Sequence, residues 1–135
     1  MCQYHSEAST VKLRRRLKNG KKIFWKVYRY ARWGISSPCR TNGVPITGPG
    51  IVKAIPEEKD FSDLVNYSSV EGGAIHVFLN REDARDYVRF EGEVVTPVIC
   101  QEKDLVSCGV TRTIGKMVTT AAFRQIEILD KDFPR

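Results

Sequence analysis

The stretch AIHVFLNREDARDYVRFEGEVVTPVIC, residues 74–100, is the most informative part of the chain because it predicts a strand, a helix and a second strand. Residues 74–79 form a short apolar run of the kind found in buried strands. Asn80 then caps a helix that we expect over residues 81–89, with acidic residues in the first turn, where the helix dipole favours negative charge. Residues 93–100 form a second apolar strand, and the proline within it indicates an edge or a bulge.

The segments before this stretch predict one more strand and many turns. Residues 23–30 (IFWKVYRY) are rich in β-branched and aromatic residues and predict a strand with Trp25 in the core. Glycine and proline recur through residues 34–56, which indicates turns and short extended pieces, and residues 57–67 predict one short acidic helix.

The segments after it predict two further strands, at residues 104–110 and 119–129, and a frayed polar tail. Strands outnumber helices, so we expect an α+β fold, a small twisted and mostly antiparallel sheet with two or three short helices. The expected organisation is a single domain with a basic helix or arm at 1–20, an α+β core at 21–129 and the tail at 130–135.

Size and composition fit one soluble globular domain. The chain has 135 residues, of which 41% are hydrophobic and 28% charged, which leaves room for a modest core without metal or disulfides. No apolar run approaches the length of a membrane span, and the N-terminus lacks the apolar core of a signal peptide. We therefore expect a cytoplasmic protein that does not act on membranes.

Positive charge is concentrated in the first part of the chain. Residues 1–55 carry twelve lysines and arginines against one acidic residue, Glu7, a net charge of +11. Residues 56–135 have a net charge of −5, which gives +6 for the whole chain. Such a basic block repels itself unless a polyanion or an acidic partner lies opposite, so it is the strongest functional signal in the sequence.

Part of this block is expected to be helical. Ser9 or Thr10 caps a short helix through Leu13 and Leu17, and Gly20 stops it. The apolar stripe is narrow, so the helix must dock on the body of the protein or become ordered on a partner.

The leading hypothesis is a small basic module that contacts nucleic acid or a nucleoprotein complex, because aromatic residues that stack on bases alternate here with cations that neutralise phosphates. One alternative is an inhibitor that occupies an acidic surface of a host protein. Another is a solvated basic face that lies opposite the acidic second half of the same domain. The candidate contact residues are Lys12, Arg14, Arg15, Arg16, Lys18, Lys21, Lys22, Lys26, Tyr28, Arg29, Tyr30, Arg32, Trp33 and Arg40.

A series of short motifs runs along the chain: Trp25-Lys26-Val27-Tyr28, Ser37-Pro38, Pro49-Gly50, Gly73-Ala74-Ile75-His76-Val77-Phe78, Ala84, Tyr87 and Ala121-Ala122-Phe123. In this order they resemble short proteins of phages and bacteria in which a G-I-H-V-F strand precedes a small helix and a valine-rich strand follows. The resemblance covers about residues 22–129, and Ala74 is an insertion relative to it. It implies a compact α+β fold, an origin on a mobile genetic element and binding to host machinery. It implies no activity.

His76 supports a second alternative, a small enzyme. It lies in an apolar strand, and histidines on strands bind the cofactor's ribose in ADP-ribosyltransferase-like enzymes. Such a site needs a catalytic glutamate, for which Glu93 or Glu127 can be nominated. The competing interpretation is a core histidine bonded to a backbone carbonyl. His5 is expected in a flexible terminus without a role.

The cysteines predict no metal site and no disulfide framework. Cys100 ends an apolar run and is expected to be a buried, inert thiol. The spacing Cys2-x-x-His5 is the only one that resembles half of a zinc site, and Cys2 could otherwise act as an N-terminal nucleophile. Phosphate-binding and hydrolase motifs are absent, so we expect no cofactor, and no small-molecule ligand is indicated.

Overall fold

A single antiparallel sheet organises the computed structural model of the chain, which describes residues 3–18, 20–32, 34–36, 46–54, 69–70, 74–113 and 115–135. Ten strands of the described residues belong to it, in the order β4-β10-β7-β2-β6-β9-β8-β1-β5, with β3 paired to β2. The strands are β1 (Gln3–His5), β2 (Lys22–Ala31), β3 (Gly34–Ser36), β4 (Gly50–Lys53), β5 (Ser69–Val70), β6 (Ile75–Phe78), β7 (Glu93–Cys100), β8 (Leu105–Thr113), β9 (Lys116–Phe123) and β10 (Gln125–Ile128).

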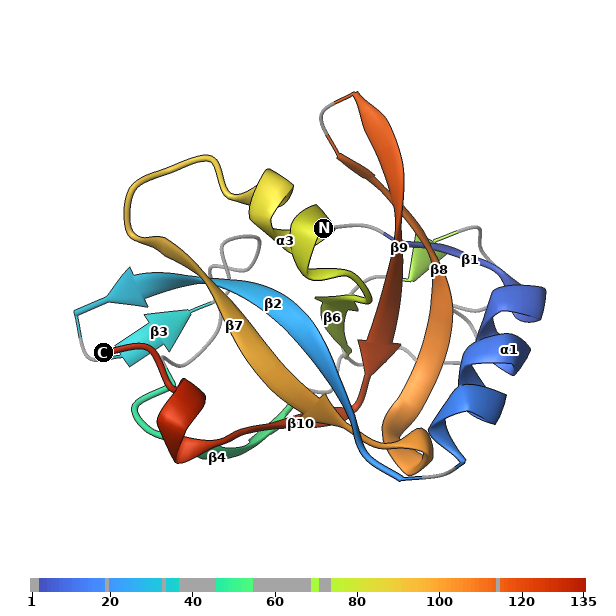
Figure 1. The fold of residues 1–135 in the computed structure, drawn as a ribbon, viewed down its shortest axis with the longest axis horizontal. Helices are drawn as coiled ribbons and strands as arrows, with labels where there is room; N and C mark the ends of the chain where they lie inside the picture. The colour runs from blue at the N-terminus through green and yellow to red at the C-terminus, as the bar shows by residue number, and fades with distance from the viewer. Residues whose placement is uncertain are drawn as a thin grey trace.

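Two α-helices accompany the sheet in the described part of the chain, α1 (Glu7–Leu17) and α3 (Arg81–Tyr87), together with the short 3₁₀ helices η1 (Glu102–Asp104) and η2 (Asp130–Asp132). α1 lies at one end of the longest axis of the molecule and α3 near its middle (Figure 1). The expected mixture of helices with an antiparallel sheet is confirmed, and the sheet predominates.

Alternate side chains of the strands fill two separate cores. On β2, Phe24 and Tyr28 belong to the larger core, which also receives Leu13 and Leu17 from α1. Val27 belongs to the smaller core with Ala84 of α3, and Trp25 packs against it half-buried. A central strand with a core on each side needs apolar residues in both phases of its alternation, which is what the IFWKVYRY stretch supplies.

Residues 74–100 form the elements that the sequence predicts. All four residues of β6 are buried, and β7 has the bounds expected from the sequence. The side chain of Asn80 accepts a hydrogen bond from the backbone N–H of Glu82 at 2.9 Å, so the helix cap is also confirmed. Ala84 is the fully buried residue of α3.

The expected bulge at Pro97 is wrong, whereas a local edge is found there, because β10 pairs with β7 at Ile99 and not at Pro97. β7 lies between β10 and β2 in the sheet, and Pro97 stands opposite Trp25 in an unbroken register with β2. An antiparallel ladder alternates hydrogen-bonded and non-hydrogen-bonded pairs, and proline is tolerated where no N–H is needed toward the neighbour.

The C-terminal part also differs from expectation. The single strand expected at 119–129 is two strands, β9 and β10, which meet at Arg124, because β9 pairs with β6 and β8 whereas β10 pairs with β4 and β7. The tail is not frayed: Phe133 packs against the larger core, and Arg135 Nη2 lies 3.0 Å from Asp130 Oδ1. The helix expected at 57–67 lies outside the described residues.

Candidate nucleic-acid interface

Helix α1 begins earlier than the sequence indicated. Its N-cap is Ser6, whose side-chain oxygen accepts a hydrogen bond from the backbone N–H of Ser9 at 3.2 Å. The assignment of the cap to Ser9 or Thr10 is therefore wrong, because the chain leaves β1 at His5 and turns directly into the helix. Gly20 has a positive φ of 123° and follows the end of the helix, as expected of a stop residue.

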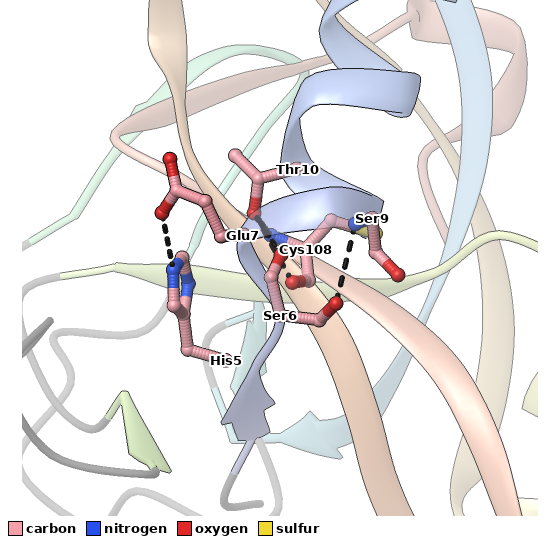
Figure 2. Close-up of polar contacts among 6 residues, drawn as sticks. All are labelled: His5, Ser6, Glu7, Ser9, Thr10 and Cys108. Atoms are coloured by element: carbon pink, nitrogen blue, oxygen red, sulfur yellow. Dashed lines mark hydrogen bonds and ion pairs between the residues drawn. The ribbon is translucent and has the colours of Figure 1, made fainter.

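Thr10 joins α1 to the sheet. Its hydroxyl accepts a hydrogen bond from the backbone N–H of Cys108 at 2.9 Å and lies 3.2 Å from the Cys108 carbonyl and 2.7 Å from that of Ser6 (Figure 2). The Ser6 N–H donates to the same Cys108 carbonyl at 3.0 Å. The backbone N–H and carbonyl of Cys108 therefore have hydrogen-bond partners although the pairing of β8 with β1 ends at the next residue, Gly109. Thr10, Leu13 and Leu17 form the buried side of the helix.

The remaining sides of α1 carry exposed cations. Arg14, Arg15 and Arg16 occupy the last turn, where the helix dipole favours positive charge. Lys21 and Lys22 are exposed just beyond the helix, and the Lys21 ammonium lies 3.9 Å from Glu127 Oε1. We call the exposed cations of this region the basic cluster: Lys12, Arg14, Arg15, Arg16, Lys18, Lys21 and Lys22.

The described acidic residues of the second half make little contact with the basic cluster. Within the described residues, the contact between Lys21 and Glu127 is the only ion pair that the cluster makes. Acidic residues of the second half pair with cations of their own half. The ammonium of Lys116 lies 2.7 Å from Asp86 and 3.3 Å from Asp83, and Arg85 lies 3.9 Å from Glu82. The interpretation of the basic block as a face opposite the acidic half is therefore not supported by the described geometry.

Two of the candidate contact residues are buried, which corrects the prediction. Tyr28 is 1% exposed and belongs to the larger core, and burial together with the nearby Cys100 raises the pKa of its phenol. Lys26 is 8% exposed, and its ammonium donates a hydrogen bond to the carbonyl of His76 at 3.0 Å. Both lie on the central strand β2, which is covered on both faces, so neither is presented to a partner.

The structure also separates Arg29, Tyr30 and Arg32 from the basic cluster. An extended chain rises about 3.3 Å per residue, which places Tyr30 about 26 Å from Lys22 along β2. The end of β2 lies at the opposite end of the molecule from α1 (Figure 1). Trp33 and Arg40 lie outside the described residues. The expected face of mixed cations and aromatics is therefore not formed by the residues that the structure places.

His76 is buried in β6, opposite Ala122 of β9. The two glutamates nominated as its partners are engaged elsewhere. Glu93 Oε1 accepts hydrogen bonds from the backbone N–H groups of Arg89 and Phe90 at 3.0 and 2.9 Å. Glu127 lies on β10, three strands from β6 in the sheet order, about 14 Å away at the usual strand spacing. Neither nominated glutamate makes a described contact with His76, and the enzymatic alternative stays a prediction.

His5 lies in a strand and contacts the first turn of α1. It is part of β1, which pairs with β8 and β5, so the expectation of a flexible terminus is wrong. Its Nε2 lies 3.2 Å from Glu7 Oε2, whereas its Nδ1 is buried without a hydrogen-bond partner among the described residues (Figure 2). The only sequence signal was an acidic residue two positions after a histidine at the start of a helix.

Cys100 and Cys108 are free and buried, and burial raises the pKa of both thiols. The interpretation of Cys100 as a buried thiol is confirmed; Cys2 and Cys39 lie outside the described residues. No group of three or more metal-ligating side chains occurs in the part of the chain that the structure describes.

Comparison of the chain with protein-family models, with curated proteins and with solved structures finds no match. The resemblance to phage and bacterial proteins therefore stays a prediction. None of the helices among the described residues has the length and apolar character needed to cross a membrane.

Proposed function

We propose that the protein is a binding module that contacts the phosphates of nucleic acid through the basic cluster on and after α1. The observation that supports this most is that the exposed cations of α1 make no ion pair with another described residue. Of the aromatic residues included in the prediction from sequence, Tyr28 and Tyr30 are not part of this surface, so the proposal rests on charge rather than on stacking.

The cations of α1 destabilise their own helix. Four pairs of like charge stand three or four residues apart: Lys12 with Arg15 and Arg16, and Lys18 with Arg14 and Arg15. Such pairs cost about 0.2–0.5 kcal/mol each, hence about 1–2 kcal/mol in total. A bound polyanion removes this cost. A helix whose charges served only solubility would not need so many cations in so few residues.

The test is the affinity for duplex and single-stranded DNA and RNA between about 50 and 200 mM salt, measured with protein freed of co-purifying nucleic acid. The variant R14Q/R15Q/R16Q removes three charges from α1, and glutamine keeps a good helix propensity. The matched control, R29Q/R81Q/K131Q, removes three exposed charges away from α1.

We expect the control to keep the salt slope of the wild-type protein. On duplex DNA, the slope of the α1 variant should be shallower by about 0.9 for each phosphate that it no longer neutralises. Equal slopes for the two variants would contradict the proposal. Absence of binding at low salt would also contradict it and would assign the basic cluster to an acidic protein surface, which capture from nuclease-treated lysate would detect.

A further inference from the structure

The cations of α1 surround the exposed part of the helix instead of forming one flat side. Successive residues of an α-helix are about 100° apart, so Thr10, Leu13 and Leu17 define the side that faces the sheet. Arg14 and Lys18 then lie to one side of the helix, and Lys12 and Arg16 to the other. A flat polyanionic surface would contact only some of them, whereas the two walls of a groove contact both sides.

The line farthest from the sheet has a different chemistry. Ala8 and Arg15 lie about 170° from the centre of the buried side, and Val11 lies about 125° from it, between this line and Lys18. Val11 is 42% exposed although it is apolar. Small apolar groups contact the methyl group of thymine, and arginine forms a bidentate contact with guanine in the major groove.

The dimensions fit the same partner. The major groove of B-form DNA is about 12 Å wide and admits an α-helix, whereas the major groove of A-form RNA is too deep and narrow for side chains to read. α1 has 11 residues and is therefore about 16 Å long. It lies at one end of the long axis of the molecule, and it is held by β8 on its buried side (Figure 1).

Charge along the helix sets its direction in the groove. Glu7 is exposed in the first turn, and the cations lie in the later turns. Phosphates repel the first turn and attract the later ones, so the later turns lie deepest in the groove, with Arg15 between the flanking cations Arg14 and Arg16.

We infer that α1 enters the major groove of duplex DNA, with Arg15 and Val11 toward the base edges and the cations on its two sides on the phosphates of opposite strands. This inference rests on the proposed function and makes it narrower. It names duplex DNA as the partner and gives Arg15 a role different from that of the neighbouring Arg14 and Arg16.

The experiment is selection of binding sites from a randomised DNA duplex, followed by affinity measurements with variants. Arg15→Lys keeps the charge but removes the bidentate contact. We expect it to keep the salt slope and to lose about 5- to 150-fold of the preference for a G·C pair at one position. The variant R14Q/R16Q should instead keep the base preference and reduce the salt slope by about 1.8.

The selected site also allows a test of Val11. Replacing the contacted thymine by deoxyuracil removes one methyl group and should weaken binding of the wild-type protein, while leaving the Val11→Ser variant, which has no methyl group to contact it, unaffected. Equal affinity for duplex DNA, duplex RNA and single-stranded DNA, or selection without a preferred sequence, would overturn this inference and leave the proposed function intact. Absence of any nucleic-acid binding would overturn both.

Discussion

The hydroxyl of Thr10 is expected to contribute more to stability than its methyl group. Thr10→Val keeps the shape of the side chain but removes the acceptor of the buried Cys108 N–H, 2.9 Å away. The Cys108 carbonyl keeps the N–H of Ser6 as its donor. One buried donor is therefore left without a partner, which costs about 1–3 kcal/mol.

Thr10→Ser is the matched control, since it keeps the hydroxyl and removes one methyl group, worth about 0.8 kcal/mol when buried. Urea denaturation followed by circular dichroism should therefore give a loss of about 2 kcal/mol for Thr10→Val and less than half of that for Thr10→Ser, with m unchanged. In a domain of this size the valine variant should melt about 5–8 °C lower than the wild-type protein. Equal losses, or a larger loss for serine, would refute the reasoning that the hydroxyl replaces a strand partner of β8.

Three further predictions concern the cores and α3. Tyr28→Phe should raise the free energy of unfolding by about 1 kcal/mol, because the Tyr28 hydroxyl is buried without a hydrogen-bond partner among the described residues. A lower free energy of unfolding for this variant in urea denaturation would show that the hydroxyl is hydrogen-bonded. The raised pKa of the Cys100 thiol means that this group ionises first in the unfolded state, so its stabilising contribution is present below about pH 8.5 and is lost as pH rises. Above that pH the stability of the wild-type protein should fall relative to Cys100→Ala by about 1.4 kcal/mol per pH unit, and parallel pH profiles would argue against a buried neutral thiol. Asn80→Ala should cost about 1 kcal/mol and Asn80→Asp much less, because aspartate still caps the N–H of Glu82; equal costs would exclude a capping role.

The sequence predicted those elements whose determinants are local. β6, the cap at Asn80 and the bounds of β7 follow from apolar runs and from a capping residue at the right place. The burial of Lys26 was not predictable in this way, because the acceptor of its ammonium is a carbonyl of β6, 50 residues away in the chain. The pairing of Pro97 with Trp25 on one side of β7 only likewise depends on where the neighbouring strands end.

Of the candidate site, the part that depends on local sequence was predicted and the part that depends on distant contacts was not. The cations of α1 are exposed, as a narrow apolar stripe on a helix predicts. The aromatic part failed because alternation along β2 does not reveal that both faces of this strand are covered, as the burial of Tyr28 shows. The distance between Lys22 and Tyr30 follows from the strand itself, since ten extended residues cannot bring both of its ends to one surface.

The most direct test of the central claim is to map the backbone amide signals that change when a short DNA duplex is added to the protein. We predict that the largest changes in an NMR titration occur between residues 11 and 22, in α1 and the start of β2, and that they disappear in the variant R14Q/R15Q/R16Q. Changes centred on Arg29 and Tyr30 or on α3, with α1 unaffected, would contradict the account.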